Sequence, residues 1–231
     1  DISRFPQLCG AADAVYNPLR SALVVAAAER EIPAAGGLYM LVAQAVKAAE
    51  LFTGTSLPEN KTDLVWREIA AEKENAVLIG MPGCGKTTIG KALAERLGKK
   101  FIDTDDEITR TAGKAPAQII TEQGEAAFRD IESRVISEVS AVQGAVIATG
   151  GGAVLRKENI SALRENGEIL FLDRPLEQLA VTFDRPLSQN RELLERRYTE
   201  RYPLYIASGK RVDCSADAEE NTKRAERALK E

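Results

Sequence analysis

The segment spanning residues 76–97 constrains the fold of this 231-residue chain more than any other. It reads AVLIGMPGCGKTTIGKALAERL, in which Gly80-Met-Pro-Gly-Cys-Gly-Lys86-Thr87 matches the pattern G-x-x-x-x-G-K-[ST]. A continuous apolar run precedes the pattern, and the residues after it place Ile89, Leu93 and Leu97 on one face of a helix. A glycine-rich loop between a buried strand and a helix turns backbone N–H groups toward phosphate oxygens. The segment therefore predicts a nucleotide-phosphate-binding loop within an α/β fold.

Each part of this loop has a separate expected role. Lys86 is expected to reach the β- and γ-phosphates of ATP, and Thr87 to ligate Mg²⁺. A chance glycine-rich turn is the alternative, but the strand and the helix that the motif requires are both present in the sequence. The predicted ATP-binding residues are Gly80, Gly83, Cys84, Gly85, Lys86, Thr87 and Thr88.

Apolar strands alternate with helical segments from residue 75 onward. The expected strands are 76–80, 99–104, 145–149 and 168–173, and the helices between them include 87–97 and 125–140. This alternation predicts a parallel sheet that is covered on both faces. The preceding residues instead show helical periodicity at 21–30, 38–52 and 62–73. We therefore expect two parts, residues 1–72 and residues 73–231.

Composition narrows the chemistry and the partners. The chain contains no histidine, which excludes Ser-His-Asp and Cys-His catalysis and removes the commonest zinc ligand. A net charge of -4 argues against non-specific binding to nucleic acid or to an anionic membrane. No apolar run approaches the roughly 18 residues that a membrane span needs. Three widely separated cysteines favour a reducing compartment, so the expected location is cytoplasmic.

Acidic residues follow the second predicted strand. Asp103 and Asp105 lie at its carboxyl end, where α/β sheets bind their ligands. Asp105 or Asp106 could alternatively do no more than cap the following helix. Further along, Arg129 and Glu132 are spaced three residues apart in a helical segment, which by itself favours a surface ion pair.

Glycines and arginines supply the remaining signals. Gly150, Gly151 and Gly152 follow the third predicted strand, and consecutive glycines at a strand end permit close approach of a ligand to the backbone. Six arginines occur from Arg185 to Arg211. They could form a solvated helical face, but beside a nucleotide site arginines also hold anions.

Taken together, these segments resemble the shikimate kinase family. The motifs GMPGCGKTT, FIDTDDEI, GEAAFR..E, GGGAV, RPL and ERYPLY occur in the family's order and spacing over residues 75–231. The resemblance implies a P-loop, nucleoside-monophosphate-kinase-like fold with a five-stranded parallel sheet, helices on both faces and a mobile lid. It also implies phosphorylation of the shikimate 3-hydroxyl with ATP and Mg²⁺, giving shikimate 3-phosphate and ADP.

The resemblance assigns a role to each matching position. Asp105 would hold the substrate hydroxyls, Asp103 would support Mg²⁺ through water, and Arg185 would reach from the lid toward the transferred phosphate. Arg129 and Arg201 would hold the shikimate carboxylate. The implied catalytic residues are Lys86, Asp105 and Arg185. The implied substrate-binding residues are Asp105, Arg129, Gly150, Gly151, Gly152 and Arg201. The implied metal ligands are Thr87 and Asp103.

Two positions depart from the family pattern, and two other functions stay open. Val181-Thr182-Phe183 stands where many members carry an arginine at the start of the lid, and Ile120 replaces a phenylalanine of the substrate wall. The chain could instead be another small-metabolite P-loop kinase, such as a gluconate kinase-like protein, or a non-catalytic nucleotide-binding module. The glycine triplet together with Arg129 and Arg201 distinguishes the shikimate kinase interpretation from the first of these.

Residues 1–55 resemble the C-terminal part of shikimate dehydrogenase, through DAVYNPLRSAL (13–23) and GGLYMLVAQAVKAAELFTG (36–54). The resemblance implies that Tyr16 and Gln44 once lined a dehydroshikimate pocket, with Met40 near the nicotinamide. Packing and surface roles are the favoured interpretation here, because no G-x-G-x-x-[GA] loop precedes this part and no catalytic Lys/Asp pair accompanies it. We expect a bifunctional fusion that is cut inside its first enzyme, a small helical appendage without dehydrogenase activity.

Overall fold

The computed structural model describes residues 2–179 and 191–230, without the side chain of Arg191. Its residues divide into two compact units. The smaller unit comprises the chain up to Glu74 together with Arg164–Asn166, and the larger unit comprises residues 75–163 and 167–231. Within the described ranges, every helix is too short or too polar to cross a membrane.

The larger unit is built on a five-stranded sheet in which all neighbouring strands are parallel. The strand order is β4 (Lys100–Asp103), β5 (Ala145–Ala148), β3 (Asn75–Ile79), β6 (Gly167–Asp173) and β7 (Lys210–Asp213). The central strand, β3, is buried at every position, as its continuous apolar sequence predicts. The predicted parallel sheet is thus confirmed. The apolar pattern did not identify β7, because Val212 is the single buried residue in this short strand.

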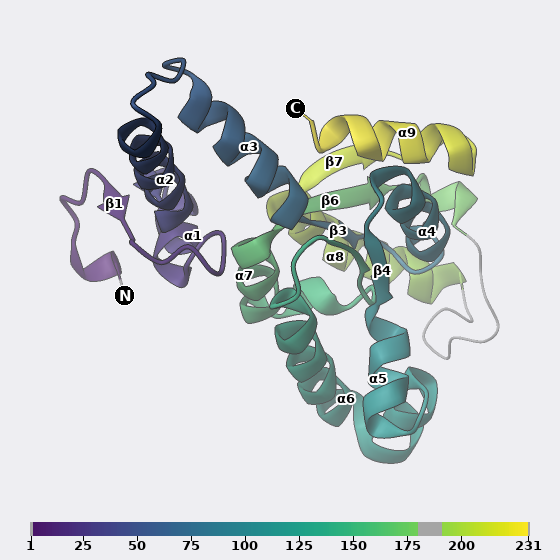
Figure 1. Cartoon of the computed structure of the whole chain (residues 1–231). Helices are drawn as coiled ribbons and strands as arrows, with labels where there is room; N and C mark the ends of the chain where they lie inside the picture. The colour runs from purple at the N-terminus through teal and green to yellow at the C-terminus, as the bar shows by residue number, and fades with distance from the viewer. Residues whose placement is uncertain (1, 180–190, 231) are drawn as a thin grey trace. The chain divides into compact units, whose positions relative to one another are not determined.

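Helices and short 3-10 turns connect these strands. The helices are α4 (Lys86–Leu97), α5 (Thr104–Ala112), α6 (Pro116–Ser140), α7 (Lys157–Asn166), α8 (Arg191–Ser208) and α9 (Ala218–Ala228). The 3-10 turns are η2 (Ala153–Leu155) and η3 (Leu176–Gln178). Figure 1 shows α4 and α9 side by side on the sheet, and α5 beside α6 beyond the end of β4. The helix predicted at 125–140 begins earlier, at Pro116, and is broken at Gly124.

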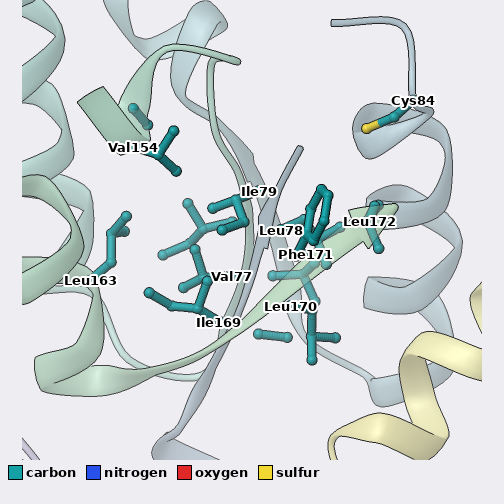
Figure 2. Close-up of a cluster of buried hydrophobic side chains, with 14 of the residues drawn as sticks. Val77, Leu78, Ile79, Cys84, Val154, Leu163, Ile169, Leu170, Phe171 and Leu172 are labelled. Atoms are coloured by element: carbon teal, nitrogen blue, oxygen red, sulfur yellow. The ribbon is translucent and has the colours of Figure 1, made fainter. Parts of the chain in front are cut away.

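The core of this unit surrounds β3 and β6. Figure 2 shows apolar side chains of both strands, including Leu78, Ile79 and Phe171, and Cys84 of the glycine-rich loop belongs to the same buried cluster. Burying one such aliphatic or aromatic side chain stabilises a fold by about 1.5–3 kcal/mol. Gly90 lets α4 approach β4 closely, because a Cβ atom there would lie 2.5 Å from the Phe101 ring. The core therefore holds the loop and its helix firmly on the sheet.

The smaller unit is mostly helical, as the sequence predicts. Its helices are α1 (Ala22–Ala28), α2 (Gly37–Thr53) and α3 (Lys61–Lys73), preceded by a 3-10 turn η1 (Ile2–Arg4). Two further elements were not anticipated, the strands β1 (Ala11–Ala12) and β2 (Ala34–Ala35), which pair in parallel. Tyr39 of α2 meets Trp66 of α3 edge to face, with ring centroids 5.9 Å apart.

Candidate active site

The carboxyl ends of three neighbouring strands bring the predicted site residues to one edge of the sheet. The glycine-rich loop follows β3, Asp103 ends β4, and Gly150 lies just beyond β5. Because β5 pairs with both β3 and β4, the three loops that follow these strands are neighbours. This edge is where parallel α/β sheets bind ligands.

The glycines of the loop are required by its backbone. Gly80, Gly83 and Gly85 have φ values of 149°, 82° and 100°, which residues with a side chain rarely adopt. At Gly80 a Cβ atom would also lie 2.8 Å from the carbonyl oxygen of Leu172. The loop ends where α4 begins, so the unpaired N–H groups of the first helical turn face it. This arrangement suits an anionic phosphate group.

Lys86 is buried inside the loop, with 7% of its surface exposed. Its Nζ atom donates to the carbonyl oxygens of Gly80 at 2.8 Å and Met81 at 2.9 Å. Cys84 is completely buried, and its Sγ atom lies 3.8 Å from the same Nζ. Thr88, by contrast, is exposed in the first turn of α4. The loop therefore concentrates one positive charge at the position where phosphates are expected.

Asp103 connects the loop to the neighbouring strand. Its Oδ2 accepts a hydrogen bond from the Thr87 hydroxyl at 2.8 Å, and its Oδ1 accepts one from the Asp105 N–H at 3.0 Å. Asp103 is thus the N-cap of α5, and the alternative that Asp105 or Asp106 caps this helix is wrong. Asp103 has the extended backbone that an N-cap requires, whereas the other two residues already lie within the helix. The Asp105 side chain instead lines a pocket.

This pocket lies beside the glycine-rich loop and combines charged with apolar walls. Its charged lining residues are Asp105, Arg129, Glu132, Arg197 and Arg201. Its other lining residues are Pro82, Pro116, Ala117, Ile120, Phe128, Gly150, Gly151 and Gly152. Phe128 adds an aromatic side chain to the lining, and Ile120 adds an aliphatic one. The pocket therefore offers hydrogen-bonding groups for a polar molecule and an apolar surface for a ring.

The pair formed by Arg129 and Glu132 is buried rather than exposed. Arg129 Nη1 donates to Glu132 Oε2 at 2.6 Å, and Nη2 donates to Glu125 Oε1 at 2.9 Å. Burial raises the pKa of the Glu132 carboxyl, and the charge of Arg129 opposes this shift. The expectation of a surface ion pair, which spacing alone favoured, is wrong because the glycines that follow β5 cover this face of α6.

The glycine triplet fits between that ion pair and the phosphate loop. A Cβ atom at Gly150 would lie 2.7 Å from Glu132 Oε1, and one at Gly151 would lie 2.8 Å from Pro82 Cδ. At Gly152 it would overlap the Arg129 guanidinium. The sequence predicted close approach of a ligand to this backbone. The structure shows that neighbouring protein groups already exclude side chains at all three positions.

Arg201 lines the pocket from α8. It is 6% exposed, and its Nη1 donates to the carbonyl oxygen of Gly151 at 3.0 Å. Tyr205 donates to the same oxygen at 2.6 Å, and burial raises the pKa of its phenol. In the described part of the chain Arg201 has no ion-pair partner, although a buried cation normally has one.

One residue of the pocket was missed, and others cannot be placed. The sequence identifies Arg197 only as one of six arginines, yet it lines the pocket with Arg201. The signal that could have found it is its position four residues before Arg201 on the same helix. Arg185 and the lid positions 181–183 lie outside the described residues.

A phosphate loop after the central strand of a parallel sheet, with a second polar pocket beside it, is the arrangement of a P-loop kinase with a nucleoside-monophosphate-kinase-like fold. Among P-loop kinases, the comparison with protein families identifies one family. The family model described as shikimate kinase matches residues 82–230. The chain therefore belongs to the shikimate kinase family.

Individual relatives agree with this family. A shikimate kinase from Clostridium beijerinckii is 46% identical over 137 residues, which are 58% of this chain and 80% of that protein. One from a Nostoc species is 44% identical over 154 residues, covering 62% of this chain and 82% of the relative. Among solved structures, the shikimate kinase from Acinetobacter baumannii in complex with shikimate has a TM-score of 0.65 and 32% identity, over 71% of this chain and 94% of that one.

Proposed function

We propose that this chain catalyses the ATP-dependent phosphorylation of the shikimate 3-hydroxyl, with shikimate 3-phosphate and ADP as products. The observation that carries the proposal is the pocket beside the phosphate loop, in which two buried arginines and Asp105 line one cavity. Shikimate has a carboxylate and hydroxyls on a ring, which match these groups. The shikimate complex of the Acinetobacter baumannii relative supports the same substrate.

Each residue of the site has a proposed role. Asp105 holds the acceptor hydroxyl and accepts its proton, and Lys86 neutralises charge on the β- and γ-phosphates. Arg129 and Arg201 hold the carboxylate, while Gly150–Gly152 form the adjoining backbone wall. Arg185, outside the described residues, is proposed to act on the transferred phosphate. Phosphoryl transfer depends on positioning and charge neutralisation rather than covalent catalysis, so the absence of histidine is no obstacle.

The oxygen atoms of Thr87 and Asp103 fit Mg²⁺. A hydroxyl and a carboxylate, 2.8 Å apart, are the hard donors that this ion prefers. The described residues contain no cluster of three or more acidic, cysteine or histidine side chains. That is compatible with Mg²⁺, which is commonly held by one or two side chains together with substrate phosphates. Bound Mg²⁺ supplies charge neutralisation on the phosphates, while Thr87 and Asp103, the latter through water, position it.

For residues 1–72 we propose a non-catalytic C-terminal fragment of shikimate dehydrogenase together with a linker helix, followed by the kinase in residues 73–231. Tyr16, Met40 and Gln44 are exposed, which supports surface roles rather than a substrate pocket. Residues 1–81 lie outside the kinase family model. Cys9, Cys84 and Cys214 are free thiols, which supports a reducing compartment such as the cytoplasm.

An ADP-release assay coupled to NADH oxidation tests the kinase proposal. With ATP and Mg²⁺ present, ADP should form when shikimate is added and not when gluconate is added. Mass spectrometry of the product should show one added phosphoryl group. Turnover of gluconate instead of shikimate would identify another small-metabolite kinase. ATP binding without transfer to either acceptor would identify a non-catalytic module.

A further inference from the structure

Arg197 is the third arginine of the substrate pocket. It precedes Arg201 by one turn of α8, and residues spaced i,i+4 project from the same side of a helix. Both side chains line the cavity that Asp105 also lines. Arg197 is half-buried, so its guanidinium is partly withdrawn from water while remaining in contact with the cavity.

The hydrogen-bonding capacity of Arg129 is largely committed to the protein. Its two terminal nitrogens donate to Glu132 and Glu125, at 2.6 and 2.9 Å. Its Nε atom is buried and has no partner among the described residues. Arg201 differs, because one of its nitrogens donates to a carbonyl oxygen and no carboxylate in the described part of the chain pairs with it. A ligand carboxylate accepts up to about four hydrogen bonds, more than one arginine usually supplies.

The charges around Arg197 and Arg201 favour an anionic ligand beside these two side chains. Burial lowers the pKa of Arg197, and the positive charge of Arg201 lowers it further. The charges of Arg197 and Arg201 lower the pKa of the Glu125 carboxyl, and Glu125 partly offsets the lowering at Arg197, but Glu125 forms its ion pair with Arg129. Like charges repel more strongly where water is partly excluded. An anionic group between Arg197 and Arg201 would relieve this repulsion.

We propose that Arg197 binds the carboxylate of the substrate together with Arg201, and that this i,i+4 pair makes the site select acceptors that carry a carboxylate. The inference rests on the proposed function and adds a specificity-determining residue to it. The family resemblance assigns carboxylate binding to Arg129 and Arg201 alone.

The test compares Arg197→Gln with Arg196→Gln. Both variants remove one positive charge from the same helix, but Arg196 does not line the pocket. The Arg196 side chain is 76% exposed and pairs with Glu200 at 2.8 Å. Loss of a charge-assisted contact at a half-buried site should raise the KM for shikimate about five- to twentyfold in Arg197→Gln. The KM for ATP should stay within about twofold, and Arg196→Gln should resemble the unmodified chain.

A second measurement separates carboxylate recognition from a structural effect. The ratio of kcat/KM for shikimate to kcat/KM for its uncharged methyl ester is independent of the fraction of folded enzyme. This ratio should fall about fivefold or more in Arg197→Gln, and Arg197→Lys should retain part of it. An unchanged ratio in Arg197→Gln, with an unmodified chain that phosphorylates shikimate, would overturn this inference alone. An unmodified chain without shikimate turnover would overturn the proposed function.

Discussion

Asp103 shows how a single side chain can serve the fold and the site together. One carboxylate oxygen caps α5, and the other accepts the Thr87 hydroxyl that we propose as a metal ligand. The pattern D-T-D-D contains three aspartates, any of which could cap the helix. The structure assigns the cap to Asp103 and the pocket to Asp105, two residues later. The proposed roles can therefore be tested by replacing individual side chains.

Replacing Lys86 with Ala should lower turnover by about two orders of magnitude or more, because the missing charge acts most strongly as the transition state forms. Steady-state kinetics and a thermal unfolding curve would be measured together. Lys91→Ala is the matched control, since Lys91 lies on the same helix and is exposed. A folded Lys86→Ala variant with near-normal turnover would refute the assignment of the phosphate loop.

Replacing Arg129 or Arg201 with Gln should weaken apparent shikimate binding about ten- to a hundredfold, equivalent to about 1.5–3 kcal/mol for a lost charge-assisted bond. ATP affinity measured without shikimate should barely change. Arg129→Gln should also lower the melting temperature more than Arg201→Gln, because it leaves Glu132 buried without its cation. Equal losses of affinity for both ligands would mean that these arginines are structural or belong to the nucleotide site.

At the scale of secondary-structure elements, α6 determines where Arg129 lies. This helix is broken at Gly124, whose φ of 86° and ψ of 165° belong to a region occupied almost exclusively by glycine. The part before the break contributes Pro116, Ala117 and Ile120 to the pocket, and the part after it contributes Phe128, Arg129 and Glu132. Both parts of this broken helix therefore line the pocket.

Gly124→Ala should therefore destabilise the protein by roughly 1–3 kcal/mol in a urea denaturation experiment, through backbone strain alone. Among the described residues, and apart from its two chain neighbours and the nearby backbone of its own helix, no heavy atom lies within 4 Å of the added Cβ, so the expected cost is backbone strain. Gln123→Ala, at the exposed preceding position, is the control and should change stability by less than about 0.5 kcal/mol. Equal stability of the two variants would show that α6 does not need this break.

At the scale of the whole molecule, the chain consists of two units with different expected contributions. Every residue assigned to catalysis or binding belongs to the larger unit, after Asn75. The smaller unit exposes several large apolar side chains, among them Leu51 and Phe52, which are 75% and 90% exposed. Its helices nevertheless pack through contacts such as that between Tyr39 and Trp66. It is therefore ordered without contributing a residue to the proposed kinase site.

Deleting residues 1–72 should leave kinase turnover within a few-fold of the full chain, because none of the proposed site residues is removed. Coupled kinetics and circular dichroism of both chains would be compared. The full chain should not form NADPH from NADP⁺ and shikimate. Shikimate-dependent NADPH formation would refute the fragment proposal, and loss of kinase activity in a folded truncation would show that the kinase needs this part.

The sequence alone was sufficient for features that depend on local patterns. The phosphate loop, four of the five parallel strands and the helices expected at 87–97 and 125–140 are each encoded within short stretches, by glycine spacing and by hydrophobic periodicity. The strand β7 was implied only by family resemblance, because a short edge strand with one buried residue has little periodicity to detect.

Tertiary structure decided which of several equivalent side chains enter the site and which are buried. Spacing could not show that Arg129 and Glu132 are covered, because the covering glycines, Gly150 and Gly152, follow β5 and lie about twenty residues away in the chain. Spacing also could not distinguish Arg197 from its neighbour Arg196. The structure shows that Arg197 lines the pocket, whereas Arg196 is exposed and pairs with Glu200. Burial and charge pairing depend on contacts between distant segments. Local sequence patterns therefore determined the elements of this protein, while packing between those elements determined the chemistry of its pocket.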